Sequence, residues 1–207
     1  MSLKSFLIAV AAAATLSGCI DTNVRYSEVL REDQTFNWNV TQINVSVPRT
    51  LTTTDQNSQA PDVDIVWIEE GPGDTYAQVQ RIFEEGVALG AGRLDASLKG
   101  GRAVRLEVEV AQFHTLTSRA RSNIGGIHNV DFYIQAFDVA TGEAISPRSF
   151  LESDQKASGG ARARQEDEAG FTMRVANVER IASVVATWLA VAGDDAILPS
   201  TRILIGR

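Results

Sequence analysis

One stretch of the sequence, Ala103 to Phe113, constrains the fold more than any other. From Val104 to Val110 its side chains alternate between apolar and charged. Such alternation is typical of a strand in an antiparallel sheet that is buried on one face and wet on the other. We therefore expect an antiparallel sheet covered on one side, with Val104, Leu106, Val108 and Val110 facing the core and Arg105, Glu107 and Glu109 facing water.

Shorter alternating runs predict the remaining strands. Between Val40 and Ile43 the alternation changes parity, so either a β-bulge or a break into two strands is needed to keep one face buried. Pro48 and a polar loop from Thr50 to Asp62 follow. The expected strands lie at about residues 36–47, 63–67, 127–139 and 144–152, the last two joined by a tight turn at 140–143.

Two helices are expected from apolar residues at helical spacing. The first begins after the N-cap Asp74, and its buried face includes Val79, Ile82, Phe83 and Val87. Gly86, Gly90 and Gly92 weaken it by up to ~1 kcal/mol each relative to alanine, which either a close approach to the sheet or early fraying explains. The second spans about residues 172–192, follows a loop at 153–170 and ends at Gly193, with a stripe of Val175, Val178, Ile181, Ala182, Val185, Trp188 and Leu189.

The expected order is therefore β, β, α, β, β, β, α. The simplest way to bury both helices is to lay them on one face of the sheet. We expect an α+β two-layer sandwich with a mainly antiparallel sheet, formed by a single domain over residues 36–193 and followed by a C-terminal tail at 194–207.

The start of the chain has the layout of an export signal. Lys4 precedes an apolar run from Phe6 to Leu16, which is too short to span a bilayer. The next residues, Leu16-Ser17-Gly18-Cys19, resemble a bacterial lipobox and contain the only cysteine. We expect a signal peptide at 1–18, an acylated (palmitate-bearing) Cys19 and a polar spacer at 19–35; the alternative is an ordinary exported protein.

The residues after Cys19 bear on the expected location, the periplasmic face of the outer membrane, and the net charge bears on the expected partners. The residue after Cys19 is Ile20 rather than aspartate, which by analogy with enteric bacteria favours that membrane, although Asp21 leaves the inner membrane open. Removal of residues 1–18 takes away one lysine and no acid, so the mature charge is 18 − 26 = −8. This sign argues against nucleic acid as a partner.

The sequence contains no motif of a known catalytic or cofactor-binding site. GxSxG, HExxH and phosphate-binding glycine loops are all missing. His114 and His128 flank the expected hairpin and would face one another if their strands pair around residues 123–126. A metal site needs further ligands, so we expect ordinary strand histidines, no metal, no cofactor and no enzymatic activity.

Arginines gather in two loops that the strand order brings to the same end of the sheet. The segments SRARSNIGG (118–126) and SGGARARQ (158–165) each combine Arg-Ala-Arg with a glycine pair. A cationic patch suited to phosphate or carboxylate groups would result. In the alternative, the arginines pair with Glu166, Asp167 and Glu168 or stay hydrated. The candidate ligand-binding residues are Arg119, Arg121, Arg162 and Arg164.

Three segments carry a resemblance to a known family. They are FHTLTSRARSNIGGIHNVDF (113–132), DVATGE (138–143) and SGGARARQEDEAGFTMRVANVERIASVVATWL (158–189). Together with the lipobox, the chain from about Ile43 to Leu189 resembles an uncharacterised lipoprotein family of alphaproteobacteria, a domain of unknown function. The resemblance implies an envelope lipoprotein and supplies no activity or ligand.

Two functions follow from the sequence as hypotheses. In the first, the protein is a non-catalytic envelope lipoprotein that binds a protein partner as an accessory or assembly factor, through a sheet edge, the apolar tail at 197–205 or the arginine loops. In the second, the arginine loops bind an anionic envelope molecule such as lipopolysaccharide, a phospholipid head group or an acidic polysaccharide.

Overall fold

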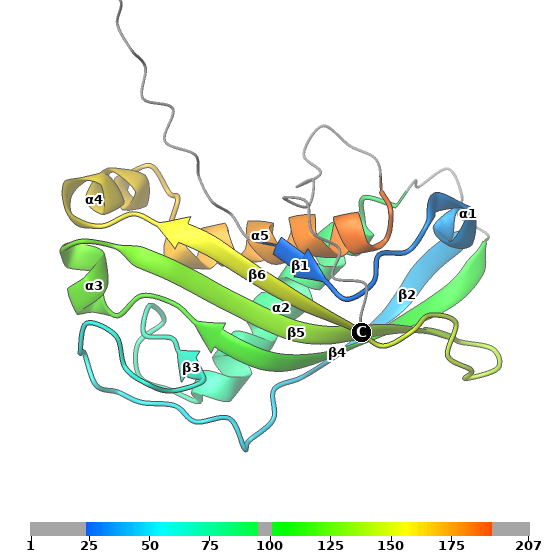
Figure 1. The fold of residues 1–207 in the computed structure, drawn as a ribbon, viewed down its shortest axis with the longest axis horizontal. Coiled ribbons are helices and arrows are strands. Elements are labelled where there is room, and N and C mark those ends of the chain that lie inside the picture. Colours follow the sequence, from blue (N-terminus) through cyan, green and yellow to red (C-terminus); the bar gives the residue numbers. More distant parts are fainter. Residues whose placement is uncertain (1–23, 95–100, 192–207) are drawn as a thin grey trace, which may run out of the picture.

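A computed structural model describes residues 24–94 and 101–191 of the chain (Figure 1). Strands and helices follow one another in the order β1 (Val24–Tyr26), α1 (Glu32–Thr35), β2 (Trp38–Ser46), β3 (Ile65–Val66), α2 (Thr75–Ala91), β4 (Arg102–His114), α3 (Ser118–Ser122), β5 (Gly126–Asp138), β6 (Ser149–Ala157), α4 (Gly160–Glu168) and α5 (Met173–Trp188).

These strands form one mostly antiparallel sheet, which confirms the α+β fold class. The strand order is β1-β6-β5-β4-β2, and the short β3 pairs with the C-terminal end of β4, at Phe113 and His114. Strands β1, β6, β5 and β4 pair antiparallel, whereas β2 and β3 both run parallel to β4. Figure 1 shows the two long helices, α2 and α5, together behind the sheet, with the other face turned to the viewer.

Alternation along β4 and β5 decides which side chains meet the helices. Val108 pairs with Ile134 and Val110 with Phe132, and all four are at most 2% exposed. Their neighbours, such as Glu109 and Tyr133, pair on the opposite face. The assignment of core and wet positions in Ala103–Phe113 is confirmed.

The parity change in β2 is a β-bulge. The register between β2 and β4 shifts between Val40 and Gln42, so that Val40 pairs with Val104 and Ile43 with Leu106. One extra residue thus keeps both apolar sets on the helix face without breaking the strand.

Helix α2 begins and packs largely as expected, but its glycines serve a different contact. The Asp74 carboxylate accepts the backbone N–H groups of Tyr76 and Ala77 at 3.1 and 3.3 Å. A Cβ on Gly90 would lie 2.5 Å from the carbonyl oxygen of Ala182, and one on Gly86 would lie 2.7 Å from Ile181 Cβ. The close approach is therefore to α5, not to the sheet.

The segment expected to be a spacer contributes to the fold from residue 24 onward. Strand β1 pairs with the edge of β6, which buries Val24 and Tyr26. Beyond it, Leu30 N donates to the carbonyl of Trp188 at 3.0 Å, and the Thr35 hydroxyl donates to that of Leu189 at 2.8 Å. The expected domain boundary at residue 36 thus falls inside the packed structure.

The C-terminal half differs from expectation in the third strand of the meander and the loop after it. The tight turn is present, with Gly142 N donating to Asp138 O at 2.8 Å, but β6 starts only at Ser149 because Pro147 has no N–H to give the ladder. The expected loop at 153–170 is instead the end of β6 followed by α4. Helix α5 ends at Trp188, and Val175 in its first turn is exposed rather than part of the stripe.

Candidate functional site

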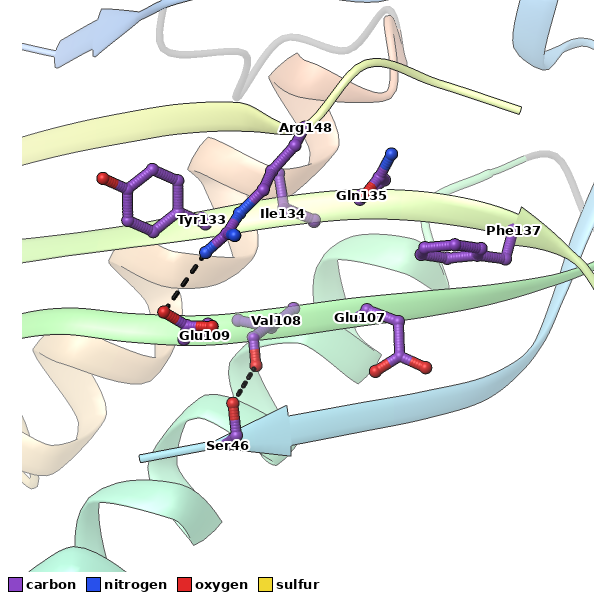
Figure 2. A pocket seen from close by; sticks show the side chains of 9 residues that line it. All are labelled: Ser46, Glu107, Val108, Glu109, Tyr133, Ile134, Gln135, Phe137 and Arg148. Carbon is purple, nitrogen blue, oxygen red and sulfur yellow. Dashed lines mark hydrogen bonds and ion pairs between the residues drawn. The ribbon is translucent and has the colours of Figure 1, made fainter. Parts of the chain in front are cut away.

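The face of the sheet opposite α2 and α5 carries polar and aromatic side chains in cross-strand pairs. We call this surface the open face. Within the described residues, the two long helices lie only on the other side (Figures 1 and 2). Strand alternation places on the open face Asn44 and Ser46 of β2, Arg105, Glu107 and Glu109 of β4, Asp131, Tyr133, Gln135 and Phe137 of β5, and Phe150 of β6, beside Arg148.

Arg148 and two aromatic rings form the first group on the open face. The guanidinium carbon of Arg148 lies 4.2 Å from the centroid of the Tyr133 ring, and Arg148 Nη2 lies 3.2 Å from Glu109 Oε1. The Tyr133 ring packs against Phe150 with centroids 4.8 Å apart. The cation–π contact and the ion pair hold the Arg148 side chain beside Tyr133, and Figure 2 shows it reaching across β5 to Glu109.

A second group, further along the same strands, also combines an arginine with an aromatic ring and a carboxylate. Arg105 lies 5.1 Å from the ring centroid of its cross-strand partner Phe137 and donates from Nε to Glu107 at 2.7 Å. Asn44 Nδ2 donates to the same Glu107 oxygen at 3.0 Å. Both carboxylates of β4 on this face are therefore already paired with arginine or amide donors.

A hollow of about 260 Å³ lies between the two groups (Figure 2). Its walls come from β2, β4, β5 and Arg148, with Tyr133 and Phe137 at its aromatic sides. The arrangement offers flat apolar rings and oriented charges over several strands. Such a surface can bind by shape and charge complementarity, and its acids are committed to arginine rather than poised for proton transfer.

Asp131 lies further along β5 on the same face. Burial, with smaller contributions from Glu152 and Asp154, raises the pKa of its carboxyl to about 6, and the backbone N–H of Ser153 donates to it at 3.2 Å. The open face thus has at its margin a carboxyl that titrates within the mildly acidic range.

The expected juxtaposition of the two arginine segments is also present. Segment 118–126 contains α3 and segment 158–165 starts α4, and the two short helices pack together at one end of the sheet (Figure 1). The glycine pairs permit this contact, because a Cβ on Gly159 would collide with the backbone nitrogen of Gly125. We call this region the α3–α4 end.

Two of the four arginines are occupied by internal partners. Arg121, whose side chain is 12% exposed, donates to Asp167 Oδ1 at 2.6 Å and to the Ala163 carbonyl at 3.4 Å. Arg162 donates to Glu166 at 3.2 Å. The structure thus follows the alternative in which the neighbouring acids pair with the arginines, while Arg119 and Arg164 are exposed and make no salt bridge within the described part of the chain.

A hollow of about 350 Å³ beside these arginines is of mixed charge. Arg121 and Arg164 line it together with the carboxylates Glu69 and Asp167. Glu69 accepts the backbone N–H groups of Met173 and Arg174 at 3.1 and 2.6 Å, which caps the start of α5. The anion-binding groups at this helix terminus are therefore already satisfied by the protein itself.

Comparison with known proteins assigns a family but no activity. The model of a family of unknown function (DUF6778) matches residues 38–202. The chain belongs to this family. No curated protein matches the chain.

Two solved structures are similar to this DUF6778 member. Both are PelC dodecamers from Paraburkholderia phytofirmans, one of them carrying a single substitution, and each is 11% identical and covers 81% of this chain and 97% of the other. Their TM-scores are 0.38 for the substituted form and 0.37 for the other. Likeness at this level carries no inference about function.

The DUF6778 match includes both histidines, which the structure places on opposite faces of the sheet. Phe113 pairs with Val130 on the helix face, so the adjacent His114 lies on the other face, whereas His128 shares the face of Val130. The two imidazoles therefore do not face one another across the hairpin. Within residues 24–94 and 101–191 no group of three histidine, cysteine or acidic residues is arranged to hold a metal ion.

His128 is 2% exposed beneath α5, which makes it a core residue. Its Nδ1 accepts from Asn177 Nδ2 at 3.2 Å. Burial, with the nearby Arg121 charge, lowers the pKa of the imidazole to about 4. The His128 imidazole is therefore neutral in the folded protein at neutral pH.

Several expectations concern residues outside the described part of the DUF6778 chain. These are the signal peptide at 1–18, the lipidation of Cys19, Gly193 as a helix stop and the apolar tail. None of the described helices is long and apolar enough to cross a membrane.

Proposed function

We propose that this protein is a non-catalytic bacterial envelope lipoprotein, of the alphaproteobacterial type, that binds a protein partner as an accessory or assembly factor. Cys19 anchors it to the periplasmic face of the outer membrane, and the open face makes the contact with the partner. The lipobox-like segment Leu16-Ser17-Gly18-Cys19 supports the first part. The second part depends on the structure of the open face.

The observation that carries the partner contact is the pair of arginine-over-ring groups. Tyrosine, phenylalanine and arginine are enriched at the centres of protein interfaces, where charged residues otherwise are scarce. Here Tyr133, Phe137 and Phe150 are half-buried, and Arg105 and Arg148 are held over two of the rings before any partner arrives. Ordered anchors lose little side-chain entropy on binding, which favours affinity.

Site-specific photocross-linking in native membranes tests this contact. A benzophenone side chain at Tyr133 is expected to give a discrete adduct, whereas one at Leu89, which is exposed on α2 on the other side of the molecule, gives none. Arg148→Ala should weaken capture of the same partner by about tenfold or more, as expected of an interface anchor. Arg81→Ala, a matched loss of an exposed ion-paired arginine on α2, should leave capture unchanged.

Equal adducts from both positions, or capture that is indifferent to Arg148→Ala, would refute the open face as the contact. The anchor is tested separately. Cells grown with labelled palmitate should label the protein, and Cys19→Ser should abolish the label. Fractionation of the two membranes then decides between the outer and the inner membrane.

A second candidate function is the binding of an anionic envelope molecule at the α3–α4 end. It is favoured by Arg119 and Arg164, which are exposed and make no salt bridge among the described residues. The double variant Arg119→Ala/Arg164→Ala leaves the internal pairs of Arg121 and Arg162 intact. Loss of co-purifying lipopolysaccharide, phospholipid or acidic polysaccharide from this variant would support the candidate, and unchanged retention would exclude it.

A further inference from the structure

We infer that the α3–α4 end rests against the phospholipid bilayer that holds the acylated Cys19. The inference depends on the lipoprotein part of the proposed function and adds an orientation to it. The contact consists of three apolar side chains, Ile124 and Phe171 on turns and Ile127 at the start of β5, together with the exposed arginines of α3 and α4. The bilayer contacts this end, and the opposite end points away from it.

Exposed apolar side chains are concentrated at this end. Six large ones are exposed within the described residues, and four of them lie at this end. Ile124 and Phe171 are on turns, Ile127 is at the start of β5 and Val175 is in the first turn of α5. Ile124 is 81% exposed and Phe171 is 64% exposed. Single exposed apolar residues need no explanation, but four at one end of the fold mark a contact surface.

The turns that carry these residues are close together and firmly held. The backbone of Ile124 lies next to Gly159, at the start of α4, where an added Cβ would come within 2.5 Å of the Ile124 carbonyl carbon. Phe171 follows the end of α4, and its N–H donates to the Glu166 carbonyl at 2.8 Å. The two most exposed apolar side chains therefore flank one nine-residue helix.

The charge of this end is opposite to that of the protein. Segments 118–128 and 156–172 contain five basic and three acidic residues, a net charge of 5 − 3 = +2, whereas the protein without residues 1–18 carries −8 and its remainder therefore −8 − 2 = −10. Apolar side chains interspersed with arginine suit the interfacial region of a bilayer, where rings and methyl groups enter and guanidinium groups meet phosphates. The rest of the surface would be repelled by anionic lipid.

The path of the chain brings the anchor to the same end. Strand β1 runs antiparallel to β6, and its first residue, Val24, pairs with Ser153. The chain therefore enters β1 from the side toward which β6 runs, which is the side of α4 (Figure 1).

The distance to the bilayer is short enough for this orientation. Cys19 precedes Val24 by five residues, which reach at most about 17 Å when extended. The end of β6 at Ala157 lies four residues beyond Ser153, or about 13 Å. The tether thus reaches the α3–α4 end. Val24 is level with Val130 of β5, since both pair with Ser153, and the turn at 138–143 begins eight residues further along β5, about 27 Å away. That turn is therefore out of the tether's reach.

The acylated thiol makes a clean labelling experiment available, because Cys19 is the only cysteine of the chain. We would introduce Ile124→Cys, Phe171→Cys or Thr141→Cys into the full chain, purify the lipidated protein, attach an NBD fluorophore and reconstitute it into vesicles of phosphatidylethanolamine and phosphatidylglycerol. Thr141, in the turn at the opposite end, is the matched control. All three positions are exposed, so circular dichroism should show an unchanged fold.

Lipids with a nitroxide near the head group should quench the fluorophore at Ile124→Cys and Phe171→Cys by about half, since an interfacial group lies ~5–10 Å deep. The fluorophore at the control position, Thr141→Cys, should not be quenched by the nitroxide lipid and should be fully accessible to quenching by iodide in the water. Equal iodide access at all three positions would overturn the inference. Protection from iodide without lipid quenching would also overturn it, because protein and not lipid would then cover this end.

Failure of the lipoprotein proposal has a different signature. If Cys19 is not acylated, the parent chain itself takes up the fluorophore, carries no palmitate and does not float with vesicles. If Cys19 is acylated and the protein floats, but Ile124→Cys and Phe171→Cys remain unquenched, only the orientation is wrong.

Discussion

Replacing His128 should remove a large part of the acid sensitivity of the fold. The imidazole is buried, and its pKa falls from 6.5 to about 4 in the folded protein. Between these two values His128 is protonated in the unfolded chain but neutral in the folded protein, so the free energy of unfolding decreases as the pH falls from about 6.5 to about 4. Above pH 6.5 both states are neutral at this site and the contribution is constant.

The size of the effect follows from the two pKa values. Lowering the pH from 7.5 to 4.5 should reduce the free energy of unfolding by about 2.5 kcal/mol through His128 alone. At pH 4.5 the carboxylates whose pKa lies below 3.8, such as Asp74 beside Arg49, remain ionised and contribute little. Asp131, whose pKa is raised to about 6, takes up a proton in the folded protein over the same range and acts in the opposite direction. The contribution of His128 is therefore isolated by comparing each variant with the parent, in which Asp131 is unchanged.

Urea unfolding at pH 7.5 and 4.5 measures the effect. His128→Leu replaces the imidazole beneath α5 with an apolar side chain that cannot titrate. In this variant the loss of unfolding free energy between the two pH values should be smaller than in the parent by most of the roughly 2.5 kcal/mol. His114→Gln, which removes the other imidazole, is the control and should leave the difference unchanged. If both variants lose as much stability on acidification as the parent, His128 is not the group responsible and the reasoning from its burial is wrong.

Two further predictions concern stability. Asp131→Asn keeps an oxygen for the Ser153 N–H but removes a carboxyl whose pKa is raised to about 6, so it should stabilise the protein at pH 7.5. This gain in the free energy of unfolding should disappear as the pH falls from 6 toward 3.8. A constant gain across this range in the same urea titrations would contradict the prediction. Gly90→Ala should destabilise by ~1–3 kcal/mol, because its Cβ would press on the Ala182 carbonyl. Gly92→Ala, at the end of the same helix with its nearest contact at 3.2 Å, should be neutral or slightly stabilising, and equal thermal shifts for the two would count against the close-approach argument.

Local patterns were sufficient to predict the central part of the fold. The alternation in β4, the bulge in β2 and the Asp74 cap are each decided by neighbours in sequence, and each is confirmed. The glycines of α2 show the limit of this reasoning. Their spacing identified a close approach, but the partner is α5, which lies some 90 residues later in the chain.

Elements that depend on distant pairing were missed. Strand β1 has three residues and gains its stability from β6, about 125 residues away, so the brief alternation of Val24 and Tyr26 does not by itself predict a strand. Helix α4 begins at the glycine pair 159–160, which resembles a loop in sequence, and Gly160 has a positive φ of 62°. The helix is held there by its contact with α3, which only the tertiary structure supplies.

The candidate site was half visible from the sequence. Arg105, Glu107 and Glu109 were identified as outward-facing, but not that Arg105 and Arg148 lie over aromatic rings of the neighbouring strand. The signal was present: Tyr133 and Phe137 occupy the outward positions of β5, where a strand in contact with water needs no aromatic residues. Large rings on the wet face of an alternating strand are therefore a second sequence signal of a site, beside the paired Arg-Ala-Arg segments.

The two proposals constrain one another through the direction of the strands. If the α3–α4 end meets the bilayer, then β4, β5 and β6 run roughly along the membrane normal, because that end is where β4 and β6 finish and β5 starts. The open face then stands upright beside the membrane, and a partner reaches Tyr133 and Arg148 laterally, from the periplasm or from a neighbouring membrane protein. Loss of the apolar turns, as in Ile124→Ser/Phe171→Ser, should therefore leave the contact surface intact but tilt it, which lowers cross-linking from Tyr133 in membranes and not in detergent solution. Equal cross-linking in both settings would show that the two surfaces act independently.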